Sequence, residues 1–364
     1  MHHKLRIGIL FGGQSAEHNI SIMSAFNVIK ALDQTKYDIV LVGIDRDGKM
    51  YLQKLEVFTQ PKPPEAGINK HIYDQVTLIP GNGHGLLVNL LHKEEVQILD
   101  VIFPVLHGPY GEDGTIQGLI KTAGIPCVGA SVLSSAICMD KDIAKRLLLQ
   151  AGLPTPESIT LHKYYNKDYN ADEIIKKLGL PCFVKPANLG SSIGITKVTS
   201  KEMLEPAISN AFFYDKKIII ETFIDGREIE CAVLGNYDLM TSLPGEIKLT
   251  KDYYSYEAKY FDAEAAEVIV VAELDEKIQT KIQSLAKDVF KCLECEGMAR
   301  VDFFLTKKNK IYVNEVNTLP GFTHISQYPK MCEAAGINIS DLLDKLVQLA
   351  IESFKETKQL KTVP

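Results

Sequence analysis

The sequence predicts a three-domain protein that combines the α/β and α+β classes. Its 364 residues are too many for one hydrophobic core, so we expect two or three domains. The first third alternates apolar strand segments with helical segments, which is typical of an open parallel sheet. The last third is dominated by strand patterns, which favours an antiparallel sheet.

The N-terminal segment begins with LRIGILFGG (5–13), an apolar run that ends in glycines and predicts a buried strand. Helical spacing follows at 21–32, a second strand at 37–45, and a short strand after the turn DRDGK. Residues 55–85 hold prolines and glycines without a clear period, so we expect an irregular insertion with some hairpin content. Another buried strand at 98–108 and a helix at 114–123 complete this unit.

The rest of the chain predicts two further units. Residues 131–152 have the pattern of two helical pieces, and Gly152 and Pro154 break the second. Two strands within 180–198 flank a glycine- and serine-rich loop, which indicates a hairpin. A helix and a strand follow at 201–213 and 217–224. From Gly226 onward strands predominate, with helices near 275–296 and 338–355. We place the domain boundaries at 1–129, 130–221 and 222–364.

The composition excludes several classes of protein. A net charge of -6 gives no general attraction to nucleic acid or anionic lipid, and no apolar run is long enough to span a membrane. The first residues lack the segments of a signal peptide. Seven scattered cysteines, an odd number, do not suggest a disulfide framework and favour a reducing cytoplasm. The pair Cys292 and Cys295 lies in a helical pattern, so we expect buried small residues there rather than a metal or redox site.

Two familiar nucleotide motifs are absent. The segment from Gly43 to Lys49 resembles a P-loop, but Met50 replaces the hydroxyl residue that would hold magnesium, and the segment turns into a strand instead of a helix. The glycine fingerprint of dinucleotide-binding proteins is missing after the first strand, which disfavours an NAD-dependent oxidoreductase.

A different phosphate-binding arrangement is present in the loop that follows Lys185. Residues 186–194, PANLGSSIG, offer free backbone N–H groups and the hydroxyls of Ser191 and Ser192 to polyphosphate oxygens. Lys185 supplies a point charge, and the glycines permit the loop to move. Taken alone, this segment is better explained as a flexible hairpin tip than as a phosphate-binding loop.

The last third adds a set of oxygen ligands. Arg300 and Asp302 lie on one predicted strand, and Glu315 and Asn317 on the next. Residues two apart share a face of a strand, so the four side chains can converge. Two carboxylates and an amide oxygen suit magnesium, and an arginine beside them suits a phosphate or a developing oxyanion. The alternative is a cross-strand salt bridge on a solvated face, which the apolar neighbours disfavour.

These residues resemble a known family. Lys141, Lys185 with GSSIG, Glu221-Thr-Phe-Ile, Glu228, RVDFF and NEVNTLPGFT are similar to the ATP-grasp enzymes. The segments GGQSAEHNIS, HGPYGEDGTIQG, CMDK and EAKY resemble the D-alanine–D-alanine ligases, in the right order along essentially the whole chain. The resemblance implies a three-domain ATP-grasp fold with an N-terminal open parallel sheet. It also implies ATP and two Mg²⁺ (or Mn²⁺) ions, two D-alanines as substrates, and a cytoplasmic homodimer.

The resemblance also implies a role for each matching residue. Lys141, Lys185, Ser191 and Ser192 would contact the phosphates of ATP, Glu221 and Ile224 would hold the adenine, and Glu228 the ribose. Asp302, Glu315 and Asn317 would bind the two metal ions. Glu17 and His107 would bind the first D-alanine, and Glu17 would join Ser191 and Tyr260 in a hydrogen-bonded network. Arg300 and the backbone of Gly321 would form the oxyanion hole, and Ser326 would receive the second D-alanine.

Three residues bear on how far this resemblance extends. Tyr260 is typically replaced in the related D-alanyl-D-lactate ligases, so its presence favours an amine acceptor. Asn19 stands where many relatives have an acidic residue, and Gln327 stands where an apolar residue is commoner. The alternatives are a D-alanyl-D-lactate or other D-amino-acid ligase, and a nucleotide sensor without catalysis. Intact Lys141, Lys185 and metal-binding residues disfavour the sensor.

Overall fold

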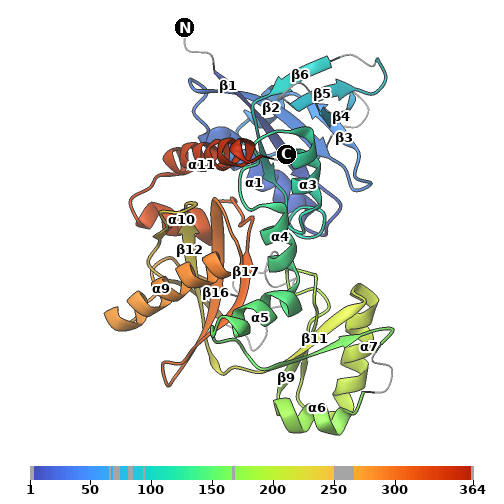
Figure 1. The fold of residues 1–364 in the computed structure, drawn as a ribbon, viewed down its shortest axis with the longest axis vertical. Helices are drawn as coiled ribbons and strands as arrows, with labels where there is room; N and C mark the ends of the chain where they lie inside the picture. The colour runs from blue at the N-terminus through green and yellow to red at the C-terminus, as the bar shows by residue number, and fades with distance from the viewer. Residues whose placement is uncertain are drawn as a thin grey trace.

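The computed structural model describes residues 4–64, 67–68, 74–80, 85–92, 95–165, 169–249 and 266–361. Within these ranges the strands form three sheets of seven, four and six strands. Figure 1 shows the sheets one after another along the longest axis, with the C-terminal sheet between the other two. The mixed α/β and α+β class is therefore confirmed.

The N-terminal sheet combines parallel and antiparallel pairs. Its parallel part is β2-β1-β7, formed by Tyr37–Ile44, Leu5–Gly12 and Val101–Val105. Four further strands extend this sheet from β2 by antiparallel pairing; the first is the short strand predicted after the turn DRDGK, and the second lies within the insertion expected at 55–85. They are β3 (Met50–Gln53), β4 (Gln75–Pro80), β5 (Gly85–Asn89) and β6 (Glu95–Leu99), with the short helix α2 (Leu55–Phe58) between β3 and β4.

The strand expected at 98–108 is divided at Asp100, whose carboxylate accepts a hydrogen bond from the N–H of Arg6. Asp100 alone separates β6 from β7, although these strands lie at opposite ends of the sheet order. One residue spans only about 3.5 Å. The sheet must therefore curl until its two ends meet.

Helices cover both faces of this sheet. The side chains of Ile7, Ile9 and Phe11 pack with helices α1 (His18–Ala31) and α11 (Ile339–Gln359). The alternate residue Leu10 faces helix α3 (Thr115–Ala123), as the period of two in a strand requires. The last long helix of the chain thus completes the core of the first sheet.

The central sheet is antiparallel and small. Its order is β10-β9-β11-β8, formed by Thr196–Val198, Cys182–Pro186, Lys217–Thr222 and Ser158–His162. Helices α6 (Ala171–Leu178) and α7 (Leu204–Tyr214) contribute the apolar side chains that pack with it, and the 3-10 turn η1 (Lys201–Met203) directly precedes α7. The pairing of β9 with β10 confirms the predicted hairpin.

The C-terminal sheet is also antiparallel. Its strands are β12 (Gly226–Leu234), β13 (Met240–Thr241), β14 (Gly245–Leu249), β15 (Ala266–Ile269), β16 (Met298–Thr306) and β17 (Ile311–Asn317). One face packs against α9 (Glu276–Cys292), and helices α4 (Val132–Met139) and α5 (Lys141–Gln150) join the same cluster. Helix α10 (Gln327–Ala334) packs beside β12. Among the described residues, no helix is long and apolar enough to cross a membrane.

Candidate active site

The predicted metal-binding residues meet across adjacent strands of the C-terminal sheet. Arg300 is directly opposite Asn317, and Asp302 is directly opposite Glu315. On the other side of β16, Glu230 of β12 is opposite Asp302. Opposite residues share a face, so five polar side chains project from one face of the sheet. The alternate residues Val301 and Phe303 are buried against α9 on the other face.

Arg300 is held by a two-pronged interaction with Asp302. Its Nε donates to Oδ1 at 2.8 Å, and its Nη2 donates to Oδ2 at 2.7 Å. A carboxylate oxygen of Glu230 lies 3.2 Å from Nε. Burial lowers the pKa of Arg300, but Asp302 and Glu230 raise it by more, so the guanidinium stays charged. This fixed fork can stabilise a developing negative charge next to the carboxylates.

The same carboxylates are chemically suited to a divalent cation. The amide Nδ2 of Asn317 donates to Asp302 at 2.9 Å, which places its neighbouring oxygen on the same face. A bulge between Asp302 and Phe303 shifts the register of β16 against β17, as strands often do beside active sites. In the part of the chain that is described, no three His, Cys, Asp or Glu side chains form a metal cluster. If a cation binds here, Asp302 and Glu315 would supply two hard ligands and Asn317 a third, and other oxygens would have to complete the shell.

Lys141 connects this sheet to the glycine- and serine-rich loop. Its Nζ lies 3.3 Å from a carboxylate oxygen of Glu315 and donates to the carbonyl of Leu189 at 2.7 Å. Its backbone N–H donates to the carbonyl of Ala187 at 3.0 Å. Lys141 begins α5, and Asp140 caps that helix by accepting from the N–H of Ile143. The lysine is therefore fixed between the glycine- and serine-rich loop and the predicted metal-binding residues.

Lys185 faces a second buried carboxylate, that of Glu221 on the adjacent strand. Lys185 forms an ion pair with one oxygen of Glu221, and Lys145 of α5 lies 2.9 Å from the other. All three side chains are buried. Burial raises the pKa of Glu221, but the two lysines lower it by more, so the carboxylate stays ionised. Burial lowers the pKa of Lys145, and Glu221 offsets only part of this effect.

The loop at 186–194, which is predicted to bind phosphate, has an unusual backbone conformation. Ser191, Ser192 and Gly194 have φ angles of 54°, 58° and 71°, in the left-handed region that L side chains seldom adopt. Two such serines in a row are strained, and strain of this kind clusters at functional sites. The N–H and side-chain amide of Asn188 both donate to Asp215, which anchors the start of the loop.

The tip of this loop reaches the N-terminal domain. A Cβ placed on Gly190 would lie 3.9 Å from a carboxylate oxygen of Glu17, and one placed on Gly108 would lie 3.2 Å from the same oxygen. Glu17 precedes α1, and its N–H donates to the hydroxyl of Ser15. Glu17 thus lies beside glycines from two different loops, and at Gly108 little room is left for a larger residue.

His107 is buried close to Glu17. Its Nε2 is 3.2 Å from the hydroxyl of Ser24, and its Nδ1 is 3.7 Å from a carboxylate oxygen of Glu112. Burial lowers the pKa of His107, but Glu112 and Glu17 raise it by more. The pKa of His107 is therefore raised above its ordinary value, and the ring lies beside two carboxylates that could also hold a substrate ammonium.

The loop after β17 brings together the residues predicted for the acceptor. The hydroxyl of Ser326 accepts from the N–H of Thr323 at 2.9 Å, and a Cβ placed on Gly321 would lie 2.7 Å from that hydroxyl. Helix α1 holds this loop, because Ser24 accepts from the N–H of Phe322 and Asn27 donates to its carbonyl. Ser24 also contacts His107, so helix α1 supports both the predicted acceptor residues and the predicted binding site of the first D-alanine.

Gln327 takes no part in this loop. Its side chain is buried, its Nε2 donates to the carbonyl of Ile269 at 3.3 Å, and it packs over Gly245. The unusual residue therefore contacts the β14–β15 edge. Tyr260 lies outside the described residues. Ile224 lies on the connection between β11 and β12, and Glu228 lies near the start of β12, where the chain passes from the central to the C-terminal sheet.

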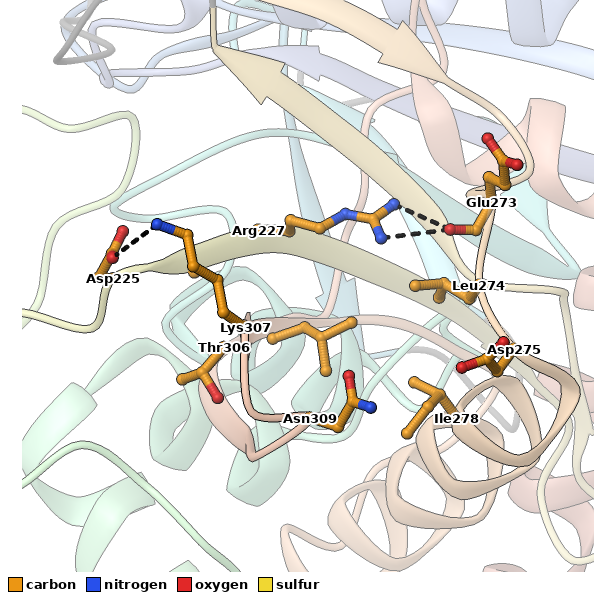
Figure 2. A pocket seen from close by; sticks show the side chains of 11 residues that line it. Asp225, Arg227, Glu273, Leu274, Asp275, Ile278, Thr306, Lys307 and Asn309 are labelled. Carbon is orange, nitrogen blue, oxygen red and sulfur yellow. Dashed lines mark hydrogen bonds and ion pairs between the residues drawn. The ribbon is translucent and has the colours of Figure 1, made fainter.

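A pocket of about 680 Å³ lies beside the start of β12. Figure 2 shows Arg227 directed at the carbonyl of Glu273, and Lys307 directed at Asp225. Of the described residues that line it, none belongs to the predicted site. Arg227 and Glu228 are neighbours on a strand and point to opposite faces, so the pocket lies behind the position predicted for the ribose.

Sequence analysis did not identify four charged residues of the site: Lys145, Glu112, Glu230 and Lys217. Lys145 follows Lys141 by one helical turn, and Glu230 follows Glu228 by one strand period, so both share a face with a predicted residue. That spacing was the available signal. Lys217 contacts Asp140 and Asp142, and neither contact has a local signature.

Two family models match the chain. The model described as D-ala D-ala ligase N-terminus covers residues 6–130, and the model described as D-ala D-ala ligase C-terminus covers residues 147–348. Together they span most of the chain and all three sheets.

Individual proteins agree with the family models. The D-alanine–D-alanine ligase A of Salmonella typhimurium is 45% identical over 360 residues, which are 99% of this chain and 99% of that protein. The structure of the D-alanine–D-alanine ligase from Coxiella burnetii has a TM-score of 0.87 and 39% identity, covering 98% of this chain and 96% of that one. The Bacillus anthracis D-alanine–D-alanine ligase complexed with ATP has a TM-score of 0.73 and 32% identity, covering 97% and 99%.

Proposed function

The chain belongs to the D-alanine–D-alanine ligase family, and on that premise we propose how its residues carry out the ligation. It is an ATP-dependent ligase whose product, D-alanyl-D-alanine, is a precursor of peptidoglycan. One observation supports the residue assignment above all. Lys141 contacts both the carbonyl of Leu189 in the loop and the carboxylate of Glu315 on the sheet. A phosphate chain bound between those two groups would lie beside this ammonium.

The nucleotide would occupy the junction of the central and C-terminal sheets. Lys141 and Lys185 would contact its phosphates, together with the hydroxyls and N–H groups of Ser191 and Ser192. The end of β11, the start of β12 and the connection between them would hold the base and sugar, with Glu221 and Ile224 at the adenine and Glu228 at the ribose.

Two divalent cations, Mg²⁺ or Mn²⁺, would be bound by Asp302, Glu315 and Asn317. Each carboxylate already holds a cationic side chain, Arg300 on Asp302 and Lys141 on Glu315, which supports their use as cation ligands. When bound, the metal ions would neutralise phosphate charge during phosphoryl transfer.

The ligation then proceeds in two steps. The carboxylate of the first D-alanine, whose ammonium is held by Glu17 with His107 nearby, attacks the γ-phosphorus of ATP and releases ADP. The amine of the second D-alanine, whose carboxylate is received at Ser326, attacks the resulting acylphosphate at its carbonyl carbon. Arg300 and the N–H of Gly321 stabilise the tetrahedral oxyanion, which collapses and expels phosphate. The loop with Ser191 shields the acylphosphate from water and joins Glu17 and Tyr260 in a network.

Tyr260 sets the choice of acceptor in this proposal, because it favours an amine over a hydroxy acid. The test measures phosphate release from ATP and Mg²⁺ with D-alanine, with L-alanine, and with D-alanine plus D-lactate, and identifies each product by mass. We expect release that depends on D-alanine and yields the dipeptide. A D-lactate ester as the main product would refute the role of Tyr260, and another D-amino acid as the preferred substrate would refute the assignment of Glu17.

A matched pair of variants tests the first subsite. Glu17→Gln removes the charge proposed to hold the substrate ammonium, so the KM for the first D-alanine should rise about tenfold or more. Glu333→Gln makes the same change at an exposed position on α10 and should leave the kinetics unchanged. An equal KM in the two variants would argue against Glu17 as the ammonium ligand.

We also propose that the chain is a cytoplasmic homodimer. All seven cysteines are free thiols, which fits a reducing compartment. The helices that cover the N-terminal sheet are the first place to look for the subunit interface. Light scattering after size exclusion would give the mass in solution, and a mass of one chain at micromolar concentration would contradict the dimer.

A further inference from the structure

Glu221 is shared by two lysines in a buried setting. Its Oε1 lies 2.9 Å from Nζ of Lys145, and its Oε2 contacts Nζ of Lys185. The side chains of Glu221 and Lys145 are each 4% exposed, and that of Lys185 is 9% exposed. Lys185 comes from β9, two residues from the position directly opposite Glu221 on β11, and Lys145 comes from α5.

Lys145 and Lys185 differ in what the proposed function requires of them. The proposed function assigns Lys185 to the phosphates of ATP, so Lys185 must weaken its contact with Glu221 when the nucleotide binds. If Lys185 were the only partner, this movement would leave a buried carboxylate without a counter-ion, which is strongly unfavourable. Glu221 would then compete with ATP for the same ammonium.

We propose that Lys145 is a positioning residue that keeps Glu221 neutralised while Lys185 turns to the nucleotide phosphates. This inference rests on the proposed function, which places Lys185 at the phosphates. Lys145 acts through Glu221 and Lys185, and it needs no contact with ATP of its own.

The charge balance of the cluster supports this role. Lys141, Lys145 and Lys185 face two carboxylates, Glu221 and Glu315. If the ion pair of Lys185 with Glu221 had only a structural role, it would be complete without Lys145. Burial lowers the pKa of Lys145, and the carboxylate of Glu221 opposes this effect. An excess positive charge beside the loop is what a polyphosphate ligand would require.

The test replaces Lys145 and measures nucleotide affinity separately from turnover. In Lys145→Met the KM for ATP should rise about tenfold to a hundredfold, while kcat changes by less than about threefold. Lys145→Arg keeps the charge and should restore a KM within about threefold of the parent. Lys177→Met removes the lysine of an exposed pair with Glu157, 3.9 Å apart, and should change neither constant. If Lys145→Met does not fold, Lys145→Gln carries the same expectation.

The Glu221→Gln background distinguishes charge compensation by Lys145 from an effect of its packing alone. In Glu221→Gln there is no buried carboxylate to neutralise, so adding Lys145→Met should change the KM for ATP by less than about threefold. The same loss in both backgrounds would overturn the proposal, as would an unchanged KM in Lys145→Met. Calorimetric titration with a non-hydrolysable ATP analogue and Mg²⁺ gives the affinities independently of ligation. If the parent chain binds the analogue but makes no dipeptide, the proposed function fails and the affinity series still decides the role of Lys145.

Discussion

Gly321→Ala tests the acceptor end of the site with a single methyl group. A Cβ at this position would lie 2.7 Å from the hydroxyl of Ser326, whereas ordinary contact begins at 3.4 Å, so the two must separate by about 0.7 Å. That hydroxyl also accepts from the N–H of Thr323 at 2.9 Å. Displacement of this order at a substrate-binding group reduces turnover by about tenfold to a hundredfold. We therefore expect kcat/KM for the second D-alanine to fall by that factor.

The assay follows phosphate release against D-alanine concentration, since the two D-alanines bind with separate KM values. The loss should appear in the second KM and in kcat, with the KM for ATP unchanged. Gly118→Ala is the matched control, because a Cβ at that helical position meets nothing within 4 Å. It should stabilise the fold by about 0.5–1 kcal/mol and leave the kinetics unchanged. An unchanged second KM in Gly321→Ala would refute the contact between Gly321 and the acceptor subsite.

Three further substitutions or treatments have defined outcomes. Arg300→Lys keeps a charge but loses the fork that grips Asp302, so kcat should fall about a hundredfold or more, as measured by phosphate release. The pKa of Glu221 lies below its ordinary value of 4.5. The ionised carboxylate therefore contributes fully to stability above pH 4.5, and this contribution is lost as the pH falls through the folded-state pKa. In Glu221→Gln the unfolding free energy, measured in urea, should decline less steeply below pH 4.5. Cys138 and Cys295 are buried with their sulfurs 3.7 Å apart, and the Cys138 pKa is raised by that contact and by burial, so mass spectrometry should find neither alkylated by iodoacetamide at neutral pH until denaturant is added.

Sequence periodicity predicts the sheet part of the site because that part depends on local spacing. Arg300 and Asp302 share a face by the period of two, and the short turn after β16 brings Glu315 and Asn317 opposite them. The bulge after Asp302 has no sequence signature in this chain, although it fixes which residue of β17 faces the carboxylate.

Other contacts depend on how the three sheets are placed, which periodicity does not reveal. Lys145 meets Glu221 because α5, which packs with the C-terminal sheet, also contacts the central sheet. The division of one apolar run at Asp100 follows from the curl of the N-terminal sheet, since one residue must connect strands at its opposite ends. In both cases the deciding contact joins segments that are far apart in the sheet order or in the chain.

The place of helix α11 has a consequence for how the protein is made. Leu342 and Leu346 of this last long helix share one apolar cluster with Ile7 and Phe11 of the first strand, and Figure 1 shows α11 lying along the N-terminal sheet. Synthesis proceeds from the N-terminus, and domains generally fold as they leave the ribosome. The first sheet of the nascent chain lacks its partner helix until translation is almost finished. The part of its apolar face that α11 covers stays exposed while the two other sheets are synthesised. The core around the first strand is therefore completed only after the last long helix has been made.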